Sequence, residues 1–198
     1  MKLQDALPDR VTVNGHVYRL KLDFRNVLRL LDVMGREGMV PGAREWQALR
    51  CVMRRPPREC GPVLAAVMGL LFPSNKAKKE NGPKLTDFEQ DADMIRAAFW
   101  QEYRINLFRD RLHWMEFSAL LSGLPEGSRY SEVLGIRARP MPAPTKWNAE
   151  ERKWLAKAKA EYALRLSGNE AAQSLSAGLR SVAESLLALA QTRGDDHA

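Results

Sequence analysis

The chain has 198 residues, of which 45% are hydrophobic, and its 31 basic and 24 acidic residues give a formal net charge of +7. A chain of this length can bury about 70% of the surface that it exposes when unfolded, so a stable core needs no disulfide or metal. The two cysteines, Cys51 and Cys60, have no histidine nearby, which argues against a zinc site and against a disulfide framework.

Membrane insertion and secretion are also disfavoured. The longest apolar run, residues 63–72, is about half of the roughly 20 residues that a membrane-spanning helix needs. The N-terminal residues MKLQDALPDR lack the apolar run of a signal peptide. Acidic residues interleave most of the basic clusters, so a solvated surface is favoured over nucleic-acid binding. We expect a soluble protein of a reducing cytoplasm.

The first predicted element is a β-hairpin with strands at residues 11–13 and 16–22. Asn14-Gly15 lies between them, and this dipeptide accepts positive φ at both positions of a tight turn. Two strands alone are marginally stable, so helices must cover one face of the hairpin. The apolar face of the second strand is made of Tyr18, Leu20 and Leu22.

Three helices are predicted next, over residues 24–35, 43–53 and 63–72. Asp23 offers an N-cap carboxylate to the first helix. Pro62 opens the third helix as its first helical residue, and because that helix is apolar nearly all round we expect it at the centre of the bundle. The side chains expected to point inward from the second helix are Trp46, Leu49 and Met53.

Residues 73–85 are poor in apolar side chains and are predicted to form an exposed loop. Thr86 or Asp87 then caps a further helix. Acidic residues in its first turns are favoured there by the helix dipole. A calcium loop is disfavoured, because alanines stand where that motif needs Gly and Glu. The acidic residues are Glu89, Asp91 and Asp93.

Residues 88–140 hold most of the heavy aromatic side chains, including Trp100, Phe108 and Trp114. Side chains of this kind usually build cores, so we expect these residues to form the core of the protein. The apolar spacing predicts two helices joined by a short turn near Arg109-Asp110-Arg111, and a third helix after residues 126–128.

His113 is the only histidine within this aromatic region. Asp110 and Glu116, each three residues away, could pair with its ring, as a catalytic imidazole requires. The sequence around it supplies no nucleophile, no glycine-rich phosphate loop and no second metal ligand. We therefore favour a structural histidine at a helix start, and we predict a protein that is not an enzyme and needs no cofactor or metal.

The proline-rich residues 139–144 predict a stiff, extended connector. This connector divides the chain into a helical domain, residues 1–140, and a C-terminal part, residues 141–198. A charged helix is predicted to begin at Asn148. Its apolar stripe is made of Trp154, Leu155, Ala158, Tyr162 and Leu166.

Apolar residues in the last segment recur at spacings of 3, 4, 3, 4 and 3, which is typical of a coiled-coil seam. The seam begins at Ala172 and covers about two and a half heptads, which is short for a self-sufficient coil. It can bind a partner, mediate homo-oligomer formation or pack back onto its own bundle. The predicted partner-binding residues are Leu175, Leu179, Val182, Leu186 and Leu189. The fold expected overall is mainly α: a compact helical bundle with an N-terminal β-hairpin and a C-terminal helical extension.

A set of motifs in fixed order allows a family to be recognised. They are VTVNG at 11–15 with Tyr18 and Asp23-Phe24-Arg25, DADMIRAAF at 91–99, QEY at 101–103, LHW at 112–114 with Phe117 and Leu120, and finally Leu124, Tyr130 and Arg137. In this order they resemble the bacteriophage gene-product-fifteen family, small tail-region proteins of long-tailed phages and prophages. The resemblance covers roughly residues 8–165. The departures are Arg104 where the family commonly has Gly, Asn106 where it has Asp, and Met115 where a second Trp is frequent.

The resemblance implies a role similar to that of tail assembly chaperones. These proteins hold the long, aggregation-prone tape-measure protein soluble while tail-tube subunits polymerise around it. The implied partners are tape-measure protein and, second to it, tail-tube protein, in the host cytoplasm, and no catalytic residue is carried over. The alternative is a permanent structural component of the phage tail.

Overall fold

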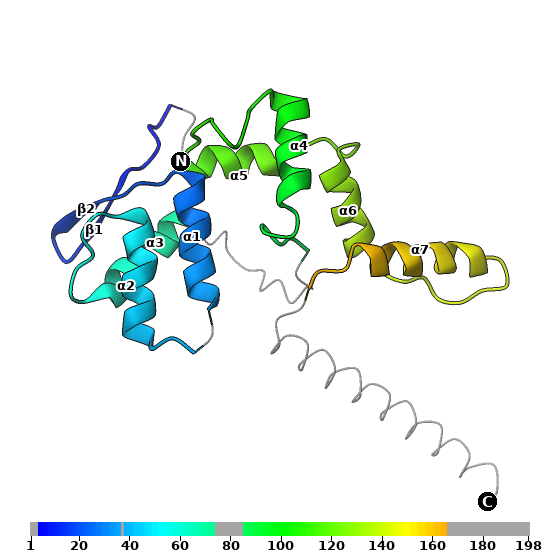
Figure 1. Cartoon of the computed structure of the whole chain (residues 1–198), viewed down its shortest axis with the longest axis horizontal. Coiled ribbons are helices and arrows are strands. Elements are labelled where there is room, and N and C mark those ends of the chain that lie inside the picture. The colour runs from blue at the N-terminus through cyan, green and yellow to red at the C-terminus, as the bar shows by residue number, and fades with distance from the viewer. Residues whose placement is uncertain (1–3, 37, 74–84, 166–198) are drawn as a thin grey trace, which may run out of the picture.

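The computed structural model describes residues 4–36, 38–73 and 85–165. These residues form seven helices and a two-stranded antiparallel sheet, so the chain is mainly α with an N-terminal hairpin, as predicted (Figure 1). The elements are β1 (Arg10–Val13), β2 (His16–Arg19), α1 (Phe24–Gly35), α2 (Pro41–Val52), α3 (Cys60–Leu71), α4 (Ala92–Tyr103), α5 (Trp114–Ser122), α6 (Arg129–Ala138) and α7 (Ala149–Glu161).

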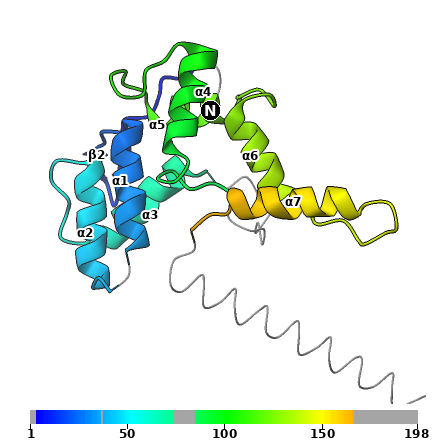
Figure 2. The same ribbon diagram turned by 45° about the vertical axis from the view of Figure 1, so that its right-hand side comes forward.

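The elements follow one another across the molecule. The hairpin and helices α1 to α3 form one end, where α1 packs on α2, α2 on α3, and α3 on β1 (Figures 1 and 2). Helices α4, α5 and α6 form the middle, and α7 packs against α6 at the other end. Because α5 contacts both α1 and α4, it joins the first group of helices to the second.

The hairpin forms around the predicted turn, with φ of 50° at Asn14 and 77° at Gly15. The second strand ends at Arg19 and not at residue 22. The Leu20 amide still donates to the Asp9 carbonyl in register with the strands, but the Lys21 amide leaves the hairpin and donates to the Val52 carbonyl at the end of α2, each at 2.7 Å. The predicted apolar face is confirmed, since it turns toward the helices and its last two residues are buried.

The Asp23 cap is confirmed, since its carboxylate accepts from the Arg25 amide at 3.0 Å. Helix α2 begins at Pro41, two residues before the predicted start, because a proline at the first helical position gives up no intrahelical hydrogen bond. The inward orientation of Trp46 was wrong. Its side chain is 46% exposed and lies under the Arg50 guanidinium, which is 5.4 Å from the ring centroid.

Helix α3 begins at Cys60, so Pro62 is its third residue and not its first. Val63, Leu64, Val67 and Leu71 are buried, but Ala65 and Gly69 are exposed. The central position predicted for this helix was therefore wrong. The residues on its solvent-exposed side are small ones, Ala65 and Gly69, which make the helix look apolar all round in the sequence.

Aromatic rings do build the core, and they meet at Phe117 of α5. Its ring centroid lies 4.7 Å from that of Phe24, 5.2 Å from that of Phe99 and 5.8 Å from that of Trp114. The Trp114 indole is buried and donates to the Leu71 carbonyl at 3.2 Å. The cluster therefore holds α1, α3, α4 and α5 together.

Three aromatic residues expected to face inward are instead exposed. Trp100 is 51% exposed, Phe108 is 72% exposed and Trp154 of α7 is 54% exposed. Helix α7 buries Leu155 and Ala158, as predicted. These exposed rings leave apolar surface on the outside of the molecule, which a monomeric core does not require.

Asp87 caps the turn before α4 by accepting from the amides of Glu89 and Gln90 at 2.9 and 3.0 Å. Asp91 was expected to act with the helix dipole, but its side chain is fully buried and makes no cap hydrogen bond. Both of its oxygens instead accept from the two terminal nitrogens of Arg137, at 2.7 and 2.8 Å. The ion pair joins α4 to α6 across 46 residues of sequence.

Arg137 also holds two further segments to this pair. It donates to the Leu85 carbonyl at 2.8 Å and to the Tyr162 carbonyl at 2.7 Å. One arginine thus connects the approach to α4, helix α6 and the end of α7. The division into residues 1–140 and 141–198 stays a prediction.

None of the helices in the described ranges is long and apolar enough to cross a membrane. The predicted loop at residues 73–85 lies mostly outside the described residues, and so does Leu166 of the α7 stripe.

Candidate partner-binding groove

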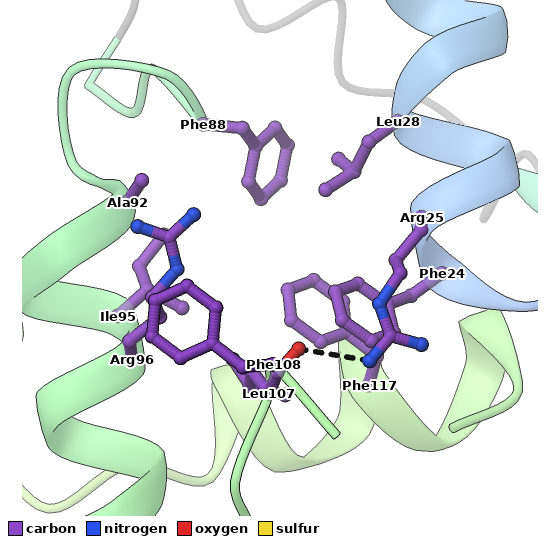
Figure 3. Close-up of a pocket in the computed structure, with 10 residues that line it drawn as sticks. All are labelled: Phe24, Arg25, Leu28, Phe88, Ala92, Ile95, Arg96, Leu107, Phe108 and Phe117. Carbon is purple, nitrogen blue, oxygen red and sulfur yellow. Dashed lines mark hydrogen bonds between the residues drawn. The ribbon is translucent and has the colours of Figure 1, made fainter. Parts of the chain in front are cut away.

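An apolar pocket of about 270 Å³ opens between α1 and α4, above α5 (Figure 3). We call this pocket the α1–α4 groove. Its floor consists of buried or half-buried apolar side chains, and Arg25, Arg96 and Phe108 form its edges. The residues that line it are Phe24, Arg25, Leu28, Phe88, Ala92, Ile95, Arg96, Leu107, Phe108 and Phe117.

Two backbone hydrogen bonds fix the floor of the groove by placing the starts of α1 and α5 side by side. The Phe24 amide donates to the Leu112 carbonyl at 3.0 Å, and the Trp114 amide donates to the Leu22 carbonyl at 2.7 Å. Stacking of Phe24 on Phe117 then completes the floor. A surface built on paired helix ends and stacked rings is preorganised for binding.

The two arginines at the edge are held in place by contacts with neighbouring groups. Arg25 donates to the carbonyls of Leu107 and Asp110 at 2.9 and 2.8 Å, and the first of these bonds is the dashed line in Figure 3. Arg96 pairs with Asp93 at 2.8 Å, and its guanidinium lies 4.6 Å from the centroid of the Phe108 ring. Arg25 also pairs with Asp23 at 3.3 Å, so the apolar surface is bordered by two ion-paired arginines at the mouth of the groove.

The apolar surface continues beyond Phe108. A neighbouring hollow of about 320 Å³ shares Arg96, Leu107 and Phe108 with the groove and extends it to the exposed ring of Trp100. A helix bound along this surface would contact the α1–α4 groove first and the neighbouring hollow next. Such an arrangement is suited to an amphipathic helix that inserts side chains spaced three or four residues apart.

His113 lies at the start of α5 and is the N-cap residue of that helix. Its Nδ1 accepts from the Met115 amide at 3.2 Å, so Nε2 carries the proton and donates to the Pro8 carbonyl at 3.1 Å. Glu116 accepts from the His113 amide at 2.8 Å and completes a capping box. One ring nitrogen thus caps the start of α5, as the sequence predicted for a structural histidine, and the other binds the N-terminal segment.

The two cysteines are free. Burial raises the pKa of the Cys51 thiol, and burial with the nearby Glu45 carboxylate raises the pKa of the Cys60 thiol. The neutral thiol is favoured at both positions, which makes each a poor nucleophile. Within the three described ranges, no group of three or more His, Cys, Asp and Glu side chains is placed to hold a metal ion.

The seam residues Leu175, Leu179, Val182, Leu186 and Leu189 lie outside the described residues, so their predicted role in partner binding stays a prediction. The α1–α4 groove was not predicted. Its lining comes from four segments far apart in the sequence. The available signal was the pair of aromatic residues, Trp100 and Phe108, that fit no inward-facing position of a regular helix stripe.

The comparisons with known proteins agree with the motifs in the sequence. A family model described as Bacteriophage Gp15 protein matches residues 3–164. The chain belongs to the bacteriophage Gp15 protein family. The region matched by the Gp15 model includes every residue that lines the groove and both members of the Asp91–Arg137 pair. No curated protein and no solved structure matches the chain.

Membership of the Gp15 family gives a context for Arg104, one of the three departures from the family pattern. This residue ends α4 in the left-handed region, with φ of 56°. Glycine is favoured at such a position because it has no Cβ to clash. A glycine at this position would therefore have a physical reason, and Arg104 adopts the left-handed conformation at a cost in backbone free energy.

Proposed function

We propose that this Gp15 family protein is a tail assembly chaperone, which binds an apolar helical segment of the tape-measure protein during tail morphogenesis. The observation that carries the proposal is the α1–α4 groove, a preorganised apolar surface open to solvent. Membership of a bacteriophage family supports a role in the phage life cycle. The role that the sequence resemblance implies, similar to that of tail assembly chaperones, supports the finer statement.

The chemistry of the groove favours a helix with apolar anchors. The floor accepts aliphatic or aromatic side chains through burial, at about 25 cal/mol for each Å² of apolar surface covered. Arg25 and Arg96 at the edge already pair with Asp23 at 3.3 Å and Asp93 at 2.8 Å, so attraction of an acidic client rests on the net charge of +7, which would speed encounter. A client can bind to such a surface and leave it without any covalent bond being formed or broken.

Co-expression with the tape-measure protein of the same phage or prophage tests the proposal. The wild-type chain should increase the recovery of soluble tape-measure protein, and Phe108→Glu should abolish that increase because it places a carboxylate on the apolar wall. Phe108 is 72% exposed, so this substitution should leave the fold intact, which circular dichroism can check. Trp46→Glu is the matched control, since Trp46 is an exposed aromatic residue of α2 away from the groove. No gain in client solubility with the wild-type chain would refute the proposal.

The second candidate is a permanent structural component of the tail. The exposed rings of Trp147 and Trp154, near and within α7, favour it, because they offer surface for a lasting contact with other tail subunits. Mass spectrometry of purified virions separates the two candidates. A chaperone should be absent or far below the copy number of tail subunits, whereas a structural component should appear at a fixed ratio to them.

A further inference from the structure

We infer that the α1–α4 groove is also a docking site for the C-terminal seam of the same chain, residues 172–189. The seam is an apolar stripe that must be covered if it forms a helix, and it is too short to be a self-sufficient coiled coil. The groove is an apolar hollow that is open in the described part of the chain. Docking of the seam in the groove would therefore remove both apolar surfaces from water.

The position of the last described residues places the seam near the groove. The Arg165 amide donates to the Gln90 side-chain oxygen at 2.9 Å, and the Gln90 side-chain amide donates to the Ala163 carbonyl at 2.8 Å. Gln90 lies in the turn before α4, two residues after Phe88 and two before Ala92, both of which line the groove. The chain after α7 is thus tied to the same end of α4 that forms one wall of the groove.

The distance along the chain is also sufficient. Seven residues lead from Arg165 to the start of the seam at Ala172. Fully extended, they span about 24 Å, whereas the part of α4 that lines the groove is about 6 Å long. Because the seam is tethered, its effective concentration at the groove is in the millimolar range, so a weak contact suffices for occupancy. A second copy of the chain or a client must compete with this advantage.

The groove and the neighbouring hollow are arranged to receive side chains spaced as they are in the seam, three or four residues apart. The groove and the adjoining hollow at Trp100 lie one after the other along α4. Leucines spaced three and four residues apart can enter both from one face of a helix. The positions flanking the seam include Ser174 and Ser181, small polar residues that can face the arginines at the edge of the groove without a clash.

If the proposed function holds, this docking has a regulatory consequence. The seam and the client segment compete for one surface, so a client occupies the groove only if it binds more tightly than the tethered seam. This consequence rests on the proposed function. The docking itself does not, because it concerns the protein alone.

A photo-crosslinking experiment on the full-length protein tests the docking. The photoreactive residue p-benzoylphenylalanine is placed at Phe108, in the wall of the groove, and in a control protein at Trp147, which is 94% exposed and lies outside it. We expect Phe108 to yield peptides from residues 172–189 crosslinked within the monomer, and the control position to yield none of them. Irradiating a mixture of isotope-labelled and unlabelled protein distinguishes links within one chain from links between chains.

Substitutions in the seam complete the test. Leu179→Glu with Leu186→Glu should reduce this crosslinking about tenfold or more, because two carboxylates would enter an apolar site. Ser174→Glu with Ser181→Glu adds the same charge at the polar positions that flank the seam, at the edge of the groove, and should leave crosslinking at or above the wild-type level. The inference is overturned if the links form between chains, if none reach residues 172–189, or if both double variants behave alike.

The amount of soluble tape-measure protein recovered on co-expression provides a separate test. With the seam docked in the groove, Leu179→Glu with Leu186→Glu should recover more soluble tape-measure protein than the wild-type chain does. If the crosslink within the chain is found but neither protein improves client recovery, the docking stands and the proposed chaperone function fails. If client recovery depends on Phe108 but the crosslink is missing, the chaperone function stands and the docking fails.

Discussion

The Asp91–Arg137 pair is the contact between single residues on which the arrangement of the second half of the chain depends most. Its side chains are 0% and 7% exposed, and Arg137 uses its remaining donors on backbone carbonyls of two other segments. A buried pair of this kind adds little net stability over apolar residues, but removal of one member leaves an uncompensated charge. The pair therefore acts chiefly to specify how α4, α6 and the end of α7 meet.

Asp91→Asn should lower the free energy of unfolding by about 3 to 5 kcal/mol, because it leaves the Arg137 guanidinium buried without a counter-charge. Urea unfolding followed by circular dichroism measures the change. The matched control is Asp93→Asn, which breaks the exposed Asp93–Arg96 pair and should cost less than about 1 kcal/mol. Equal losses in the two variants would show that the buried pair does not hold α4 to α6.

Arg104 is a second residue with a measurable backbone cost. In the left-handed region an L-residue with a Cβ is disfavoured by roughly 1 to 2 kcal/mol, and part of this cost disappears with glycine. Arg104→Gly should therefore raise the free energy of unfolding by about 0.5 to 1 kcal/mol. Arg104→Ala keeps the Cβ and should give no such gain. If alanine stabilises the protein as much as glycine does, the gain comes from removing the arginine side chain and not from the backbone.

At the scale of elements, α5 connects the two groups of helices through Trp114 and Phe117. Trp114→Ala should lower the free energy of unfolding by about 3 to 5 kcal/mol, because Trp114 is only 5% exposed and its indole donates a buried hydrogen bond. Trp100→Ala removes the same side chain from the exposed face of α4 and should change stability by about 0.5 kcal/mol or less. Thermal and urea unfolding of both variants provide the comparison. Similar losses would contradict the division into core and surface tryptophans.

The helices and the hairpin were predictable because each depends on local signals. Asn14-Gly15 can form the tight turn unaided, Asp23 can cap α1 from within one turn, and apolar spacing marks the buried side of a helix. The direction of Trp46 was not predictable in this way. Periodicity places a side chain on a face of its helix, but the tertiary neighbours decide which face is covered.

The groove and the Asp91–Arg137 pair could not be predicted from the sequence, for a different reason. Both bring together residues separated by dozens of positions, such as Phe24 with Phe117 and Asp91 with Arg137. No spacing rule for a single helix or strand reports such contacts. Acidic residues near a helix start fit the dipole, so the local interpretation of Asp91 was reasonable, and only its burial shows the other role.

At the scale of the whole molecule, the groove exists because α1 and α4 approach each other only through α5. Stacked rings fill the space above α5, and the mouth stays open between Leu28 and Phe88 on one side and Phe108 on the other (Figure 3). An opening of this kind exposes apolar surface unless the seam or a client covers it, and exposed apolar surface has a cost in solubility. Such a cost is consistent with a surface kept for a binding partner.

Hydrogen–deuterium exchange, measured with and without tape-measure protein, tests most directly the claim that this protein acts by holding an apolar helix in the α1–α4 groove. The measurement uses the Leu179→Glu, Leu186→Glu variant, because in the wild-type chain a docked seam would already slow exchange in the groove. The account predicts slower amide exchange on binding in residues 85–96 and 104–113, which form the wall and edge of the groove, with little change in the hairpin and α2. Protection confined to the hairpin and α2, or no difference between the free and mixed samples, would contradict it.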